Sequence, residues 1–211
     1  MRNRGASSIY SLLSGVSSLC YSMIFSIELI YQVKIVGLDP LQLILIGSVQ
    51  QSVNLLFQAP TGILADMYSR RWAVVSGFFL IGIGYLIEGC IPIFTVVLAA
   101  AGIAGLGATL ANGADSAWIA DEVGVERVGQ VYIRSAQIGS IASLLGIGIS
   151  VVLVNMSLNL PIVLGGGLFI SLSIVLDLAL GRQIAHPFQT RPLQYRSAVA
   201  FILKNPLCGH F

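Results

Sequence analysis

Glu28 has the clearest capacity for chemistry in this sequence, because it is a carboxylate inside a long apolar segment. At 100° per residue on a helix, Phe25 shares a face with a row of serines, and Tyr21 and Glu28 border that face. A carboxylate removed from water can exchange a proton or attract a cation. Two interpretations stay open for Glu28: a proton or cation site, or a residue near the end of the segment whose carboxylate reaches water. The serines are Ser7, Ser11, Ser14, Ser18 and Ser22.

A second polar stripe lies in the next apolar segment, where Gln50, Asn54 and Gln58 recur every four residues and Gln51 lies beside them. Polar stripes on two neighbouring helices suit a water-filled cavity, but they equally suit helices that hydrogen-bond to one another. For the serines the two interpretations are balanced. For Gln51, Asn54 and the aromatic pair of the first segment, the cavity is favoured, so these are candidate substrate-binding residues.

Four further polar residues lie in or near the later apolar segments. Asn112 and Asp115 are one helical turn apart and are candidates to line an inner vestibule. Glu88 is expected at the membrane–water interface. Asp177 is expected to pair with Arg182 or to reach water. Polar groups inside a membrane are functional candidates because lipid penalises them.

The sequence lacks the residue patterns of enzymes, metal sites and nucleic-acid-binding proteins, so these classes of function are disfavoured. No nucleophile–base pair, phosphate-binding loop or pair of catalytic acids can be identified, so we expect no enzyme activity. The three cysteines, Cys20, Cys90 and Cys208, lack C-x-x-C spacing, and the two histidines are far apart, so we expect neither a metal nor a cofactor. The basic residues are not interleaved with aromatics, which disfavours nucleic acid as a partner.

The composition indicates a surface that faces membrane lipid. The chain of 211 residues is 56% hydrophobic and only 9% charged, whereas soluble domains carry about 25% charged residues. A membrane-spanning helix needs about 20 mostly apolar residues, and six stretches qualify. They are Ser8–Val33, Leu41–Ala65, Trp72–Cys90, Ile93–Ala117, Val131–Met156 and Leu160–Leu180. Before the second stretch, Asp39 can cap the helix and Pro40 suits its first position.

The basic residues predict how these helices are oriented. Of the eleven lysines and arginines, only Lys34 lies on one side of the six segments. The other ten precede the first segment, flank the connections after the second and fourth, or follow the sixth. Because lysine and arginine concentrate in cytoplasmic loops, we expect both termini in the cytoplasm and the protein in the plasma membrane.

The connection after the second segment carries an unusual group of residues. It reads Gly62-Ile-Leu-Ala-Asp66-Met-Tyr-Ser-Arg70-Arg71. Gly62 lets another helix come close, and Asp66 can cap a facing helix N-terminus, where partial positive charge collects. Arg70 and Arg71 can pair with carboxylates on neighbouring helix ends and so hold one conformation and release it in another. Alternatively, the arginines only anchor the topology. The nearest candidates on those helix ends are Asp121 and Glu122, at the end of the fourth helix.

This connection resembles the signature G-x-L-A-D-r-x-G-R-R/K of major facilitator superfamily transporters, with Ser69 in place of a glycine. The fourth segment also resembles a family pattern, but Ala101 and Ala104 stand where drug antiporters carry arginine and glutamine. No proline follows the glycines of the fifth segment, so the motif of drug antiporters is absent there. The matching residues of the fourth segment are Leu98, Gly105, Gly107 and Ala108.

The resemblance implies an all-α fold, with a bundle of six transmembrane helices in a 3+3 repeat over residues 1–181 and a basic cytoplasmic linker over 182–211. Complete members have a second six-helix half, with the substrate site between the halves, so a C-terminal half is expected as a partner. The implied function is secondary transport of a small organic molecule by alternating access, with efflux and proton coupling as first expectations. A sugar or metabolite permease and a non-transporting membrane scaffold are the alternatives.

Overall fold

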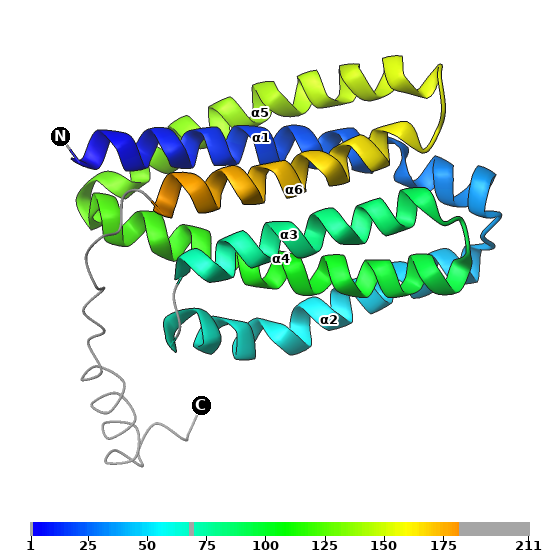
Figure 1. Cartoon of the computed structure of the whole chain (residues 1–211), viewed down its shortest axis with the longest axis horizontal. Helices are drawn as coiled ribbons and strands as arrows, with labels where there is room; N and C mark the ends of the chain where they lie inside the picture. The colour runs from blue at the N-terminus through cyan, green and yellow to red at the C-terminus, as the bar shows by residue number, and fades with distance from the viewer. Residues whose placement is uncertain (1, 68–69, 182–211) are drawn as a thin grey trace, which may run out of the picture. The chain divides into compact units, whose positions relative to one another are not determined.

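The computed structural model describes residues 2–67 and 70–181, and every element in these ranges is helical (Figure 1). The elements are α1 (Arg2–Tyr31), a π-helical turn η1 (Gln32–Val36), α2 (Pro40–Met67), α3 (Arg70–Cys90), α4 (Phe94–Val123), α5 (Val125–Val154) and α6 (Leu160–Gly181). Six helices are long and apolar enough to cross a membrane. This confirms the predicted all-helical fold with six spans.

The chain divides into two compact units, Met1–Ala179 and Leu180–Phe211. The first contains nearly all of the described residues. The predicted linker over 182–211 lies outside the described residues, so its helical, amphipathic character stays a prediction.

The ends of two helices follow from local sequence. At the start of α2, the Asp39 carboxylate accepts a hydrogen bond from the Gln42 backbone N–H at 2.8 Å, and the Gln42 side chain accepts one from the Asp39 N–H at 3.1 Å. This reciprocal cap confirms the predicted helix start, with Pro40 at the first position. Helices α4 and α5 run further toward each other than predicted and meet at Gly124, whose φ of 84° suits glycine.

Helix α1 packs along α5 through serines and glycines. The Ser11 and Ser135 hydroxyls lie 3.1 Å apart, and the Ser14 hydroxyl donates to the Ser135 carbonyl at 3.3 Å. Near the other end, the Ser150 hydroxyl donates to the Met23 carbonyl at 3.0 Å. Between these contacts, a Cβ on Gly146 would lie only 2.5 Å from the Leu19 carbonyl oxygen. For these serines, the helix-packing interpretation is the one that the structure supports.

Helix α3 touches two helices, backbone to backbone, at glycines. A Cβ on Gly77 would lie 2.8 Å from the Gly107 carbonyl of α4, and a Cβ on Gly107 would lie 2.6 Å from the Gly77 carbonyl. The same reciprocity joins Gly82 to Gly166 of α6, at 2.7 and 2.9 Å. No side chain fits at these positions without the helices moving apart, so glycine sets the spacing.

The packing of the six helices repeats after three. Helix α1 packs on α5, and α2 packs on α4. Helix α3 packs on α4, and α6 reaches α1, where Gly165 faces Ile24. Exchanging α1 with α4, α2 with α5 and α3 with α6 turns the α1–α5 contact into the α2–α4 contact, the α3–α4 contact into the α1–α6 contact, and the α3–α6 contact into itself. In Figure 1, α5, α1 and α6 lie side by side. This is the symmetry expected of a 3+3 repeat.

Candidate functional site

An aromatic cluster forms where α1, α3 and α6 meet. The rings of Tyr21 and Phe25 stack with centroids 5.4 Å apart, and Tyr21 meets Phe169 edge-on at 4.8 Å. Phe25 also meets Tyr85 of α3 edge-on at 6.2 Å, while Phe169 stacks on Phe78. Tyr85 and Phe169 are buried, whereas 53% of Phe25 is exposed. The cluster therefore holds the two predicted aromatic residues in place and presents one ring, that of Phe25, at the surface of the described unit.

Glu28 lies one turn beyond Phe25 and is joined to a second carboxylate by an amide. The Gln32 Nε2 group donates to Glu28 Oε1 at 3.3 Å and to Glu88 Oε1 at 2.8 Å. Gln32 and Glu88 are only 5% and 2% exposed, while Glu28 is partly exposed. The Glu88 carboxylate therefore points into the bundle against η1, while the expectation that the residue lies at the depth of the membrane–water interface stays a prediction. Sequence reasoning missed both Gln32 and Glu88 as candidate site residues.

The π-helical turn η1 positions Gln32. The turn begins at Gln32 and ends at Val36. Gly37 follows it in the left-handed backbone conformation, with a φ of 75°. The Gly37 N–H donates to the Gln32 carbonyl, and the Leu38 N–H donates to the same oxygen at 3.1 Å. π-helical turns are rare and are found often at functional sites. Here the turn closes the end of α1 with the Gln32 side chain between two helices.

The predicted amides of α2 lie in one polar group. The Asn54 Nδ2 group donates to Gln51 Oε1 at 2.9 Å, and the Gln51 side chain is exposed. Asn54 Oδ1 is buried and has no hydrogen-bond partner. One turn away, the side chain of Gln50 hydrogen-bonds to Tyr85, which itself contacts Phe25. The structure thus links α2 to the aromatic cluster through Gln50. From the sequence alone, Gln50 is identified only as a member of the polar stripe in the second apolar segment.

Asn112 and Asp115 lie on α4 one turn apart, as predicted. Asn112 is exposed and Asp115 is partly buried. Asp115 interacts electrostatically with Tyr10 of α1 and with Tyr132 of α5, whose rings meet edge-on at 5.8 Å. Asp115 also interacts electrostatically with Tyr21 of the aromatic cluster, so the structure relates it to three tyrosines.

The predicted gating residues lie at three helix ends. Gly62 is exposed on α2, five residues before that helix ends at Met67. Asp66 belongs to the last turn of α2, Arg70 and Arg71 begin α3, and Asp121 and Glu122 belong to the last turn of α4. Apart from Gly62, the side chains of this group lie outside the described part of the structure. Their pairing therefore stays a prediction.

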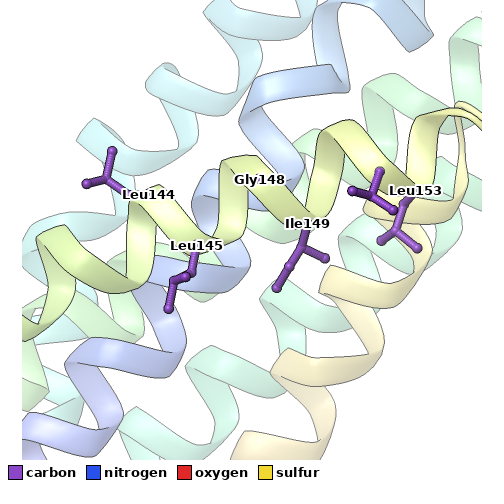
Figure 2. Close-up of a pocket in the computed structure, with 6 residues that line it drawn as sticks. Leu144, Leu145, Gly148, Ile149 and Leu153 are labelled. Atoms are coloured by element: carbon purple, nitrogen blue, oxygen red, sulfur yellow. The ribbon is translucent and has the colours of Figure 1, made fainter.

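A shallow apolar groove runs along α5. Figure 2 shows Leu145 and Ile149 extending from the same side of the helix. The groove has no polar side chain, so it suits hydrocarbon contact and cannot orient a polar ligand. Its lining residues are Leu144, Leu145, Gly148, Ile149, Val152 and Leu153.

The end of α3 is closed by side chains from elsewhere in the chain. Pro92 has no N–H, so the Glu88 carbonyl lacks its usual donor four residues on. The buried Tyr31 hydroxyl donates to that carbonyl at 2.8 Å. The Asn159 amide donates to the next carbonyl, of Gly89, at 3.4 Å. Tyr31 thereby fastens the end of α1 to the end of α3 beside the residue that bridges the two carboxylates.

Two comparisons relate the chain to known proteins. A family model described as Major Facilitator Superfamily matches residues 10–206. Over 141 residues, the chain is 28% identical to a protein of Bacillus subtilis (strain 168) described as the uncharacterized MFS-type transporter YxaM. That alignment covers 64% of this chain and 34% of the relative, so the chain spans about a third of the relative's length.

Removal of the Tyr31 hydroxyl tests the closure of α3. We expect Tyr31→Phe to lower the free energy of unfolding by roughly 1–3 kcal/mol, because a buried carbonyl loses its partner. Thermal unfolding of the purified chain in detergent measures the change. Asn159→Ala is the matched comparison and should cost less, because its hydrogen bond is longer and only partly buried. Equal stability of Tyr31→Phe and the unmodified protein would contradict this account.

Proposed function

This chain belongs to the major facilitator superfamily, and on that premise we propose that it forms one six-helix half of a secondary transporter that moves small organic molecules by alternating access. One observation carries the proposal beyond the family. An exposed aromatic ring, Phe25, lies one turn from a partly exposed carboxylate, Glu28, at the junction of α1 and α3. Transporters of this kind bind substrate at residues near the middle of the membrane and on the surface between the two halves.

The pairing of Phe25 with Glu28 favours an amphipathic organic cation as substrate, and efflux as the direction. A cation over an aromatic face gains electrostatic attraction, which grows when water is excluded. A carboxylate within one turn adds a second attraction for the same charge. The apolar part of such a substrate suits the remaining aromatic cluster, where Tyr21 stacks on Phe25.

A sugar or metabolite permease is the second candidate. The observation that favours it is the polar group on α2, where Gln51 is exposed and the Asn54 carbonyl oxygen has no partner. Amides that donate and accept hydrogen bonds suit the hydroxyl groups of a neutral substrate. The two candidates differ in the helix that contacts the substrate, α1 for a cation and α2 for a neutral polyol.

We further propose that the exposed faces of α2 and α5 contact a second six-helix half. Large apolar side chains are exposed along both helices, among them Leu55, Leu56, Leu144 and Leu145, and the groove of α5 lies on this surface. The matched relative is about three times as long as the segment aligned to this chain, which leaves room for such a half. Lipid is expected to cover the apolar faces that the second half does not.

We also propose that the protein lies in the plasma membrane with both termini in the cytoplasm, and ten of the eleven basic residues support this orientation of the termini. In a Cys20→Ser, Cys208→Ser background, the exposed Cys90 should react with a membrane-impermeant maleimide applied to intact cells. A cysteine placed at Ser69, in a variant without the three native cysteines, should react only after permeabilisation. Labelling of Ser69→Cys in intact cells would overturn this orientation.

Transport by variants of Phe25 tests the substrate class. Cells expressing the chain together with its proposed second half are loaded with a fluorescent lipophilic cation, and export is followed. Loss of a cation–π contact of about 1–2 kcal/mol predicts that Phe25→Ala raises the half-saturating cation concentration roughly fivefold to thirtyfold, while Phe25→Trp largely preserves it. Gln51→Ala should leave cation export unchanged. The sugar or metabolite alternative predicts the opposite pattern, with Gln51→Ala impairing uptake of a neutral substrate.

Gating by the connection after α2 is tested at Asp66. We expect Asp66→Asn to reduce transport several-fold with normal insertion, because the amide keeps the shape but loses the charge that favours a helix N-terminus. Asp39→Asn, which changes an exposed carboxylate at the other end of α2, is the control. If Asp66→Asn and Arg70→Ala both transport at the normal rate, the gating role is overturned and the arginines serve only as topology anchors.

A further inference from the structure

The buried carboxylate of Glu88 has no role in the function proposed above, and its surroundings indicate one. Glu88 and Glu28 come from different helices, yet each accepts a hydrogen bond from the same nitrogen, Gln32 Nε2. We propose that Glu28, Gln32 and Glu88 form a shared-proton unit, in which the two carboxyl groups together carry one proton, on one group or the other, and exchange it as a single site. Its use in transport rests on the proposed function, whereas the sharing of the proton does not.

The hydrogen bonds fit one ionised and one protonated carboxyl group. A primary amide has two N–H groups, so Gln32 can donate one to each carboxyl at the same time. With both groups ionised, two like charges would face each other across one nitrogen in a place that water barely reaches. One added proton removes that repulsion, and Gln32 still donates to the carboxylate that keeps its charge. The unit therefore carries one negative charge.

The side chains around the unit supply no positive charge to replace the proton. The titratable groups that interact with it are Tyr31 of α1 and Tyr85 of α3, with Cys90 beside Tyr31 and Tyr21 beside Tyr85. Each of these is neutral or negative. Lys34 of η1 is exposed, and among the described residues no ion pair joins it to either carboxylate. A buried carboxylate pair without a basic neighbour is relieved most simply by a proton.

The two carboxyl groups differ in access to water. Glu88 is 2% exposed, and its helix is fastened to α1 by the Tyr31 hydrogen bond. Glu28 is partly exposed and lies one turn from the exposed ring of Phe25. Glu28 is thus the group through which the proton enters and leaves. A cation bound against Phe25 would release the proton to water and take its place beside Glu28, so that one cation exchanges for one proton.

Infrared difference spectroscopy of this chain in lipid nanodiscs tests the sharing without any transport assay. A protonated carboxyl group has a carbonyl stretch that an ionised one lacks. We expect the unmodified chain to show that band at neutral pH. Glu28→Gln and Glu88→Gln should each lower the pH at which the band disappears in a titration, because the remaining carboxylate has lost its like-charged neighbour and gained an amide. Asp39→Asn, at an exposed carboxylate, should leave the band unchanged.

Three other infrared results would each overturn the proposal that Glu28 and Glu88 share one proton. No band in the unmodified chain would mean that both groups are ionised. A band that disappears at the same pH in both single variants as in the unmodified chain would mean two independent acids. A band that survives in the double variant would belong to another carboxyl group. If Glu88→Gln fails to insert, Glu28→Gln carries the same expectation. Failure of cation export with the expected infrared pattern would overturn the proposed function alone. Normal cation export without the expected infrared pattern would overturn only the shared-proton unit.

Discussion

The spacing of α3 from its neighbours is the constraint on which the rest of the bundle depends. At Gly77 the backbone of α3 touches α4, and at Gly82 it touches α6, in both cases against a second glycine. Backbones that approach this closely gain van der Waals contact, which is the main attraction between helices where lipid replaces water. The C-terminal half of α3 is therefore enclosed, and the residues that follow the glycines, Tyr85 and Glu88, are buried with it.

Burial of the C-terminal end of α3 creates a second requirement, since a helix end cannot leave carbonyl groups without partners away from water. Pro92 removes one donor, and Tyr31 and Asn159 supply replacements from α1 and from the connection between α5 and α6. The Tyr31 hydrogen bond fixes the end of α1 against α3, and the π-helical turn begins at the next residue. Gln32 is held between Glu28 and Glu88 as a consequence. The candidate proton site thus follows from how a helix end is satisfied.

The sequence predicted the elements well and the contacts of single side chains poorly, for physical reasons. Six apolar stretches and the Asp39 cap depend on local composition, which a sequence displays directly. The burial of Glu88 depends on how α3 is rotated about its axis, and only the contacts with α4 and α6 determine that. A signal was present, because Gly77, Gly84 and Glu88 fall on one helical face, and a face of small residues packs against protein. Gln32 gave no such signal, since the π-helical turn changes the angle at which its side chain leaves the helix.

The serines of α1 and the residues Tyr21, Phe25 and Glu28 looked alike in the sequence, as polar or aromatic groups along one stretch of an apolar helix. What separates them is the helix opposite. Small residues of α5, such as Ser135 and Gly146, let the N-terminal and middle parts of α1 pack closely against α5. The serine hydroxyls there are therefore used in contacts between the two helices. Near Phe25 the partners are the large rings of Tyr21 and Tyr85, which hold the phenylalanine ring at the surface instead of covering it. Whether a polar stripe fastens helices or faces a substrate is therefore decided by the size of the residues across from it.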